Sequence, residues 1–314
     1  MANGAVFFIY ETTIFKNLKI DLSGRYDRYW YLDTSIYNLY SAIKETRVDE
    51  TTKDSFNPKI SLKFNMDEKT SINSSIGTGF ITPTSYQLYY SDISASTQWL
   101  LNPDLKSEGS ITMDLGIKRS FDNGINLGLT LFYTLWKDKI GSIIVDYGTP
   151  LKQQYQNIGE AESKGIEFQV DKRFGENWST FFNYTYNRTE ITKDRANPSF
   201  IGNELPNMPG HKFNLGLTYE KKGDFTTWAL LRYAGSSYSD EKNTIVDSKG
   251  YRWKKDGYYV IDISLVKLFH FKEWYLKDVV LTVAIDNLFN KHYQKGFFGR
   301  DEGRIVRGEL ALRF

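Results

Sequence analysis

Residues 306–314 alternate between a face without charges and a face that carries the charged side chains. One face carries Val306, Gly308, Leu310, Leu312 and Phe314, and the other carries Arg307, Glu309, Ala311 and Arg313. Such a period of two is that of a β-strand with unlike faces. An aromatic residue on the apolar face at its end is typical of a membrane β-barrel, whose last strand faces lipid. We therefore predict that Leu310, Leu312 and Phe314 face lipid and are needed for barrel assembly.

Composition narrows the class of membrane protein. No stretch of the chain approaches the roughly 20 consecutive apolar residues that a spanning helix needs, so a helical membrane protein is excluded. Aromatic residues make up 16% of the chain although only 40% of it is hydrophobic, which fits alternating strands with aromatic girdles. The chain has no cysteine, so neither disulfides nor thiolate metal sites are available.

The same period of two recurs along the chain and predicts about thirteen strands of an all-β, antiparallel transmembrane β-barrel. The expected strands lie near 5–14, 18–27, 59–64, 70–80, 111–118, 127–133, 166–171, 182–186, 213–219, around 228, 257–268, 279–289 and 303–314. Short turns, such as Asp122-Asn-Gly124, alternate with long connections, such as a polar one expected at 33–57 and another after 133. This sorting of connections by length is typical of a barrel with periplasmic turns and extracellular loops.

Several stretches resemble the conserved elements of one family. They are Gly79-Phe-Ile-Thr-Pro-Thr84, Asn102-Pro-Asp-Leu-Lys-Ser-Glu108, the segment 157–167 (NIGEAESKGIE), the segment 205–212 (LPNMPGHK) and the segment 286–293 (DNLFNKHY). In their order and spacing, and with the final Phe314, they are similar to TonB-dependent outer-membrane receptors. The prolines in these elements stop strands and the glycines relieve crowding, so we interpret most of the elements as structural.

The resemblance implies an outer-membrane protein that imports a scarce nutrient, most often a ferric siderophore or a similar metal chelate. Members of this family have 22 strands around a plug domain that precedes the barrel, and they take energy from the TonB-ExbB-ExbD complex. The barrel-assembly machinery inserts them into the lipid bilayer. Residues 1–314 show no sign of a plug, so we interpret them as the C-terminal part of the barrel wall.

Candidate ligand-binding residues are aromatic or basic and lie in the expected extracellular loops. We predict a ligand site from Tyr86, Tyr89, Tyr90 and Trp99, and from the basic, aromatic stretch around Arg252 and Trp253. The interval 79–108 contains no histidine that could ligate a haem iron. The three histidines, His211, His270 and His292, are far apart in sequence, so we expect no metal site, no cofactor and no catalytic centre. A net charge of +2 gives no reason to expect a nucleic-acid partner.

Two other functions fit part of these observations. A passive outer-membrane porin would share the barrel and need neither a plug nor an energy source. A soluble carbohydrate-binding β protein would share the richness in aromatic residues. None of the three interpretations is an enzyme.

Overall fold

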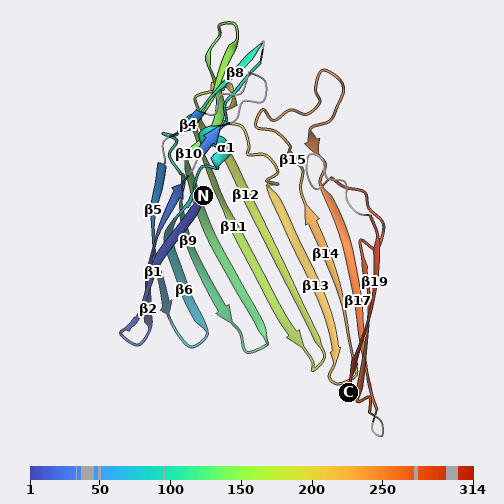
Figure 1. Cartoon of the computed structure of the whole chain (residues 1–314). Coiled ribbons are helices and arrows are strands. Elements are labelled where there is room, and N and C mark those ends of the chain that lie inside the picture. The colour runs from blue at the N-terminus through green and yellow to red at the C-terminus, as the bar shows by residue number, and fades with distance from the viewer. Residues whose placement is uncertain (33, 37–45, 49–50, 95, 272–274, 295–302) are drawn as a thin grey trace.

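The computed structural model describes residues 1–32, 34–36, 46–48, 51–94, 96–271, 275–294 and 303–314. Its main feature is a curved antiparallel wall in which thirteen strands follow one another in chain order (Figure 1). These strands are β1 (Ala2–Ile14), β2 (Leu18–Tyr31), β5 (Thr51–Asn65), β6 (Thr70–Ile81), β9 (Glu108–Ser120), β10 (Ile125–Asp146), β11 (Leu151–Phe174), β12 (Trp178–Asp194), β13 (His211–Lys221), β14 (Phe225–Ala234), β17 (Tyr258–His270), β18 (Asp278–Asp286) and β19 (Ile305–Arg313). The predicted fold class and the predicted number of wall strands are confirmed.

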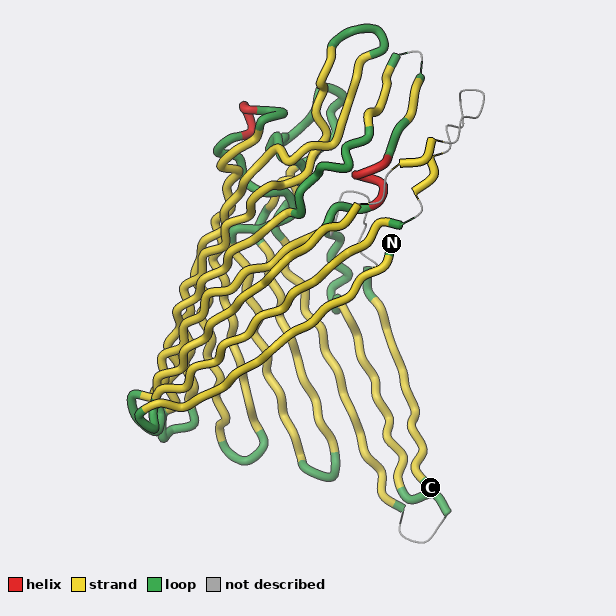
Figure 2. Tube along the Cα trace, turned by 60° about the vertical axis from the view of Figure 1, so that its left-hand side comes forward, coloured by secondary structure: helices red, strands yellow, loops and turns green. Residues whose placement is uncertain are grey.

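The remaining elements lie in the long connections. They are β3 (Thr34–Ile36), β4 (Thr46–Val48), the helix α1 (Ser85–Tyr89), β7 (Asp92–Ile93), β8 (Thr97–Leu100), the 3-10 helix η1 (Pro198–Phe200), β15 (Ser237–Tyr238) and β16 (Lys254–Lys255). No helix in the described residues has the length and apolar character needed to cross a membrane. The wall is open, because β1 and β19 stand at its two ends and each pairs with a single neighbour (Figure 2).

The register of the strands places apolar residues of neighbouring strands side by side on the outer face. Leu22 of β2 lies opposite Ile60 of β5, Ile60 lies opposite Ile76 of β6, and Ile76 lies opposite Met113 of β9. These side chains are exposed, as expected of a face that is solvated by lipid. The alternate residues, such as Lys59 in β5, form a polar inner face. A one-residue slip in any strand would turn its charges toward the hydrocarbon, so the pattern fixes the register.

The tight turns predicted from the sequence all lie at one end of the wall (Figure 1). Gly124, in the turn between β9 and β10, has a backbone φ of 78°, a conformation that costs glycine little and a side-chain-bearing residue more. Gly175 and Gly223 have φ values of 62° and 74° in two further turns of this end. Long connections, including 82–107 and 195–210, lie at the other end, which we identify as the extracellular side.

Two expected connections were wrong in extent. The described part of the expected connection 33–57 contains strands, since β5 already begins at Thr51. The long connection expected after residue 133 is a hairpin, because β10 continues to Asp146 and β11 starts at Leu151. These extensions lie at the extracellular end of the wall. Without an apolar side, the sequence there loses the alternation by which strands are predicted.

The terminal strand has the two faces that its sequence predicts. Leu310 is 61% exposed and lies opposite Leu281, and Leu312 lies opposite Val279, so both belong to the outer apolar face. On the inner face Arg307 makes an ion pair of 2.8 Å with Asp286. The apolar face of β19 is therefore continuous with that of β18.

We predict that Leu310→Arg impairs insertion far more than Arg313→Leu. An arginine facing lipid costs up to about 2–4 kcal/mol, the cost being largest at the midplane, whereas Arg313 is largely exposed and its nearest acidic atom, on Asp278, is 3.8 Å away. The measurement is the insertion yield of each variant of the complete receptor into liposomes. Equal yields would contradict the assignment of the two faces.

We also predict that residues 1–314 alone do not form a compact barrel. The open edges of β1 and β19 present backbone groups that lipid cannot hydrogen-bond, and an odd number of antiparallel strands cannot close antiparallel. Expression of the chain with an export signal should give material whose gel mobility is unchanged by boiling. A compact, boiling-sensitive species would contradict this prediction.

Candidate functional site

An aromatic cluster lies at the extracellular end of the wall, beside the connection between β6 and β9. Four rings contact one another in a closed circuit of pairs. Tyr86 stacks on Tyr90 with ring centroids 4.4 Å apart, and Tyr90 meets Trp99 edge-on at 5.5 Å. Trp99 stacks on Tyr155 at 5.3 Å, and Tyr155 returns to Tyr86 at 6.1 Å. We call these four residues the aromatic cluster.

The short helix α1 sets the first two rings on one side. Pro83 precedes it, and Thr84 caps it: the Thr84 side chain accepts from the Gln87 amide at 3.1 Å, while the Gln87 side chain accepts from the Thr84 amide at 2.8 Å. Tyr86 and Tyr90 are four residues apart, so their rings lie above one another on one face. This spacing accounts for their stacking.

The opposite side of α1 packs into the principal buried core of the described chain. Leu88 and Tyr89 contact Tyr31 and Leu105 there, and all four are almost completely buried. The Tyr31 hydroxyl donates to the Pro83 carbonyl at 2.5 Å, which ties the start of the helix to β2. Tyr89, predicted as a ligand contact, thus supports the cluster from below instead of forming part of its surface.

A parallel strand pair brings the other two rings to the helix. β8 runs parallel to the first residues of β11, with Trp99 opposite Gln153, and Tyr155 follows two residues later. Sequence analysis missed Tyr155 because parallel pairing between distant segments leaves no local pattern. Its position two residues before Asn157, the first residue of a recognisable element, was the one available signal.

Asparagine side chains fasten these segments together. The Asn102 side chain donates to the Tyr155 carbonyl at 2.8 Å, while the Asn102 amide donates to the Leu88 carbonyl at the same distance. The Asn157 side chain accepts from the Lys106 amide at 2.9 Å and donates to the carbonyls of Lys106 and Asp138. Two of the family-like elements therefore act as clamps, because their asparagine side chains hydrogen-bond a loop to the wall. This agrees with our interpretation of most of these elements as structural.

Tyr90, one of the four residues of the aromatic cluster, has a raised pKa. Tyr90 is half-buried, and desolvation, with smaller contributions from Tyr86 and Asp92, raises its pKa to about 12. Its hydroxyl lies 3.4 Å from an Asp92 carboxylate oxygen. Tyr86, in contrast, is 56% exposed, so the cluster presents both an apolar ring face and a protonated phenol.

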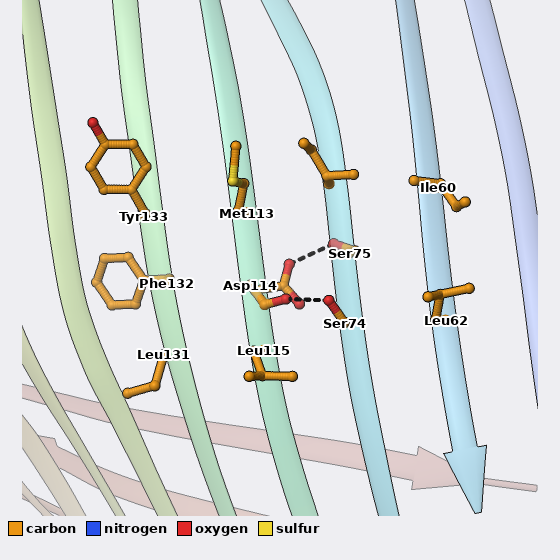
Figure 3. A pocket seen from close by; sticks show the side chains of 11 residues that line it. Ile60, Leu62, Ser74, Ser75, Met113, Asp114, Leu115, Leu131, Phe132 and Tyr133 are labelled. Carbon is orange, nitrogen blue, oxygen red and sulfur yellow. Dashed lines mark hydrogen bonds between the residues drawn. The ribbon is translucent and has the colours of Figure 1, made fainter.

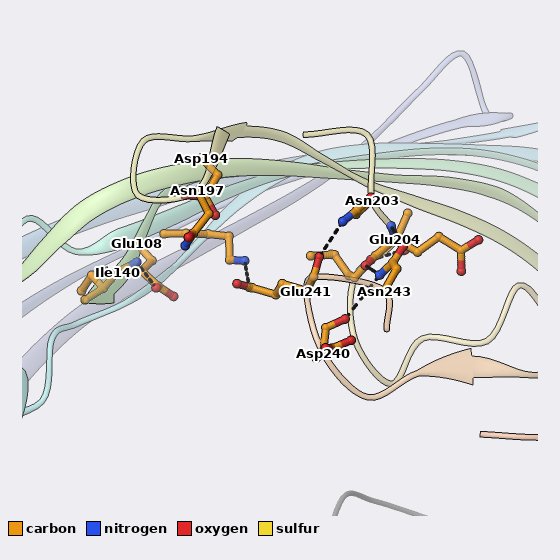
Figure 4. A network of polar contacts seen from close by, with 12 residues as sticks. Glu108, Ile140, Asp194, Asn197, Asn203, Glu204, Asp240, Glu241 and Asn243 are labelled. Carbon is orange, nitrogen blue, oxygen red and sulfur yellow. Dashed lines mark hydrogen bonds and ion pairs between the residues drawn. The ribbon is translucent and has the colours of Figure 1, made fainter. Parts of the chain in front are cut away.

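A polar network joins other long connections across the rim (Figure 4). Lys139 of β10 makes an ion pair of 2.8 Å with Glu241, in the connection between β15 and β16. The Asn203 side chain donates to the Glu241 carbonyl at 2.9 Å, and Asn243 exchanges hydrogen bonds of 2.8 and 2.9 Å with the backbone of Glu204. The connections 195–210 and 239–253 are thereby held to each other and to the wall.

Arg252 and Trp253, the second predicted group, are engaged within their own loop. Arg252 pairs with Asp256 at 2.6 Å, and the Trp253 indole donates to Asp247 at 3.1 Å. That indole hydrogen bond is the main reason that the pKa of Asp247 lies below its usual value. The structure does not bring this pair into the circuit of aromatic rings, and its contact with a ligand stays a prediction.

Metal coordination by the chain itself has no support in the described residues. No three histidine, aspartate or glutamate side chains there lie close enough together to hold an ion. The His211 ring lies 2.8 Å from the Tyr184 hydroxyl, and His270 lies 2.7 Å from Asp278. Each of these histidines thus has a structural partner on the wall.

Comparison with known proteins places this arrangement in a family. The sequence matches the family TonB dependent receptor-like, beta-barrel over residues 2–288. It is 28% identical over 272 residues to the iron-regulated outer membrane virulence protein of Vibrio cholerae serotype O1, covering 82% of this chain and 39% of that protein.

Solved structures share the fold. The siderophore receptor PiuA from Acinetobacter baumannii superimposes with a TM-score of 0.72 at 22% identity, over 99% of this chain and 42% of that chain. The copper transporter OprC gives 0.70 at 16% identity, over 98% of this chain and 47% of that chain. The chain spans about two fifths of the length of the first relatives it matches. It belongs to the family of TonB-dependent receptor β-barrels of the outer membrane.

Proposed function

We propose that residues 1–314 form the C-terminal part of the wall of a receptor that imports a ferric siderophore or a similar metal chelate. In this proposal the complete receptor closes a 22-stranded barrel around a plug and draws energy from the TonB-ExbB-ExbD complex. The observation that carries the proposed substrate is the aromatic cluster, which is built on clamped segments at the extracellular rim. Similarity to relatives such as the siderophore receptor PiuA from Acinetobacter baumannii supports the same substrate class.

The chemistry of the cluster suits an intact chelate. Aromatic rings gain free energy by stacking on flat organic groups, and the exposed face of Tyr86 is available for such a contact. The Tyr90 hydroxyl is directed at Asp92 at 3.4 Å, and its raised pKa makes a phenolate harder to form here than on a tyrosine in water, which disfavours direct coordination of iron. The site would therefore recognise the organic shell of the chelate and leave the metal inside it.

Membership of the family bears on the two alternative functions. The soluble carbohydrate-binding protein is wrong, because the chain is a membrane barrel wall. A passive porin has the same kind of wall, but no feature of the described residues favours it over an energised receptor. The porin and the receptor differ in their need for energy, which an uptake assay measures directly.

We predict that Tyr86→Ala and Trp99→Ala each weaken chelate binding by at least about fivefold, since truncating an aromatic anchor commonly costs more than about 1 kcal/mol. Binding of candidate ferric siderophores to the purified complete receptor would be followed by quenching of tryptophan fluorescence for Tyr86→Ala, and by isothermal titration calorimetry for both variants. The matched control is Tyr147→Ala, which removes an 82% exposed tyrosine at the tip of the β10–β11 hairpin.

Uptake of radioactive iron by cells then tests the mechanism. We expect uptake to stop when an uncoupler removes the proton gradient, and to fall in both cluster variants but not in the Tyr147 variant. Uptake that continues without the gradient would favour the porin. Unchanged affinity in both cluster variants would remove the aromatic cluster as the ligand site.

A second prediction concerns ionisation. The Tyr90 phenol of the folded protein has a pKa of about 12, above the value near 10 of an unfolded chain. The unfolded chain therefore loses this proton first, and the cluster loses stability as pH rises from about 10 to 12 but not below. The ultraviolet difference titration of wild type minus Tyr90→Phe should show its transition near 12, and a transition near 10 would contradict the raised pKa of Tyr90.

A further inference from the structure

The outer face of the wall has a shallow depression, or dent, at Ser74, a small polar residue among larger apolar ones. Ser74 of β6 lies opposite Leu62 of β5 and Leu115 of β9, in a row that is otherwise apolar. Its hydroxyl donates to the Asp114 carbonyl at 3.0 Å, so this hydroxyl is satisfied within the wall. Above and around it lies a groove of about 380 Å³, lined also by Ile76, Met113 and Leu131 (Figure 3).

The groove leads to a pair of adjacent cations. Tyr133, at the upper edge of the groove in Figure 3, lies opposite both Met113 of β9 and Lys164 of β11. Lys164 in turn lies opposite Arg188 of β12, so two like charges face each other across neighbouring strands. Like charges directly opposite each other repel, and an anion that contacts both would relieve the repulsion.

These cations occupy the first polar level above the apolar wall. The pair below them toward the membrane is Ile166 and Tyr186, and the pair beyond them is Glu162 and Glu190. Lys164 contacts Glu162 at 2.7 Å, whereas Arg188 approaches Glu190 only to 3.5 Å, and the two cationic side chains remain 50% and 62% exposed. Both carboxylates lie beyond the cations, away from the apolar part of the wall. The side of the two cations that faces Ile166 and Tyr186 therefore carries no carboxylate at this register.

We propose that this face binds a phosphorylated lipid of the outer leaflet, with an acyl chain in the groove over Ser74 and its phosphate on Lys164 and Arg188. The groove is apolar and lies on the lipid-facing side, which selects a hydrocarbon chain. The cation pair follows directly above the apolar residues Ile166 and Tyr186, and a lipid phosphate is an anion that Lys and Arg bind through charge-assisted hydrogen bonds. Tyr133, whose hydroxyl donates to Glu162 at 3.0 Å, joins the two parts of the site.

Native mass spectrometry of the complete receptor in mild detergent tests this proposal. After delipidation, the receptor is titrated with lipid A carrying its phosphates, with dephosphorylated lipid A and with inorganic phosphate. We expect wild type to retain phosphorylated lipid A, and Lys164→Gln/Arg188→Gln to weaken retention about tenfold or more, as the loss of charge-assisted hydrogen bonds requires. Inorganic phosphate should not bind measurably, because it lacks the acyl chain.

The groove has its own variant and control. Ser74→Leu fills the dent and should lower retention, whereas Ala229→Leu adds the same bulk at another outward position of the wall, opposite Leu217, and should not. Lys221→Gln, which removes an exposed lysine beside a turn at the other end, is the control for charge. Boiling-sensitive gel mobility establishes that each variant is assembled, and if Ser74→Leu is not, the cation variant decides alone.

Three results would overturn the proposal. They are a wild-type receptor that retains no lipid A, equal retention after removal of the phosphates, and equal retention by the cation variant. A loss of chelate uptake without a change in lipid retention would bear on the aromatic cluster alone, so the two proposals fail separately.

Discussion

The wall depends on one requirement, which is that every backbone N–H and C=O group in the hydrocarbon has a partner. A strand obtains those partners from its neighbours, so each strand of the wall pairs antiparallel with the next one along the chain. This ladder fixes the register, and the register in turn aligns Leu22, Ile60, Ile76 and Met113 across four strands. The exposed apolar face and the polar inner face follow from the same hydrogen bonds.

The sequence predicted the strands well where one face contacts lipid, and less well elsewhere. Where lipid touches one face and a polar interior the other, as around Leu129 and Ile166, alternation is strong and the predicted strands are found. The upper residues of β5, from Thr51 to Asn57, are instead mostly polar on both faces. Apolar and polar residues do not alternate in such segments, so the upper parts of β5, β10 and β11 were predicted as connections.

The candidate site was predicted in part for a similar physical reason. Tyr86, Tyr90 and Trp99 were predicted as ligand contacts because aromatic residues in a loop suggest a binding surface, and the structure shows that their rings contact one another. Tyr89 was misplaced because one step along a helix turns a side chain by about 100°, enough to move it from the surface to the core. Tyr155 reaches the cluster only through the parallel pairing of β8 with β11, and local sequence carries no record of such a pairing.

The elements that resemble the family and the residues proposed to touch a ligand are different residues with different physical tasks. Asn102 and Asn157 bind backbone groups, so their contacts hold the loops in place whatever the ligand is. The ring of Tyr86 contacts Tyr90 and Tyr155, and more than half of its surface is exposed. The similarity of these asparagine-containing elements to those of the family therefore indicates a shared barrel fold. This chain shares that fold with both a siderophore receptor and a copper transporter. The proposal for the ligand therefore rests on the aromatic cluster and not on these elements.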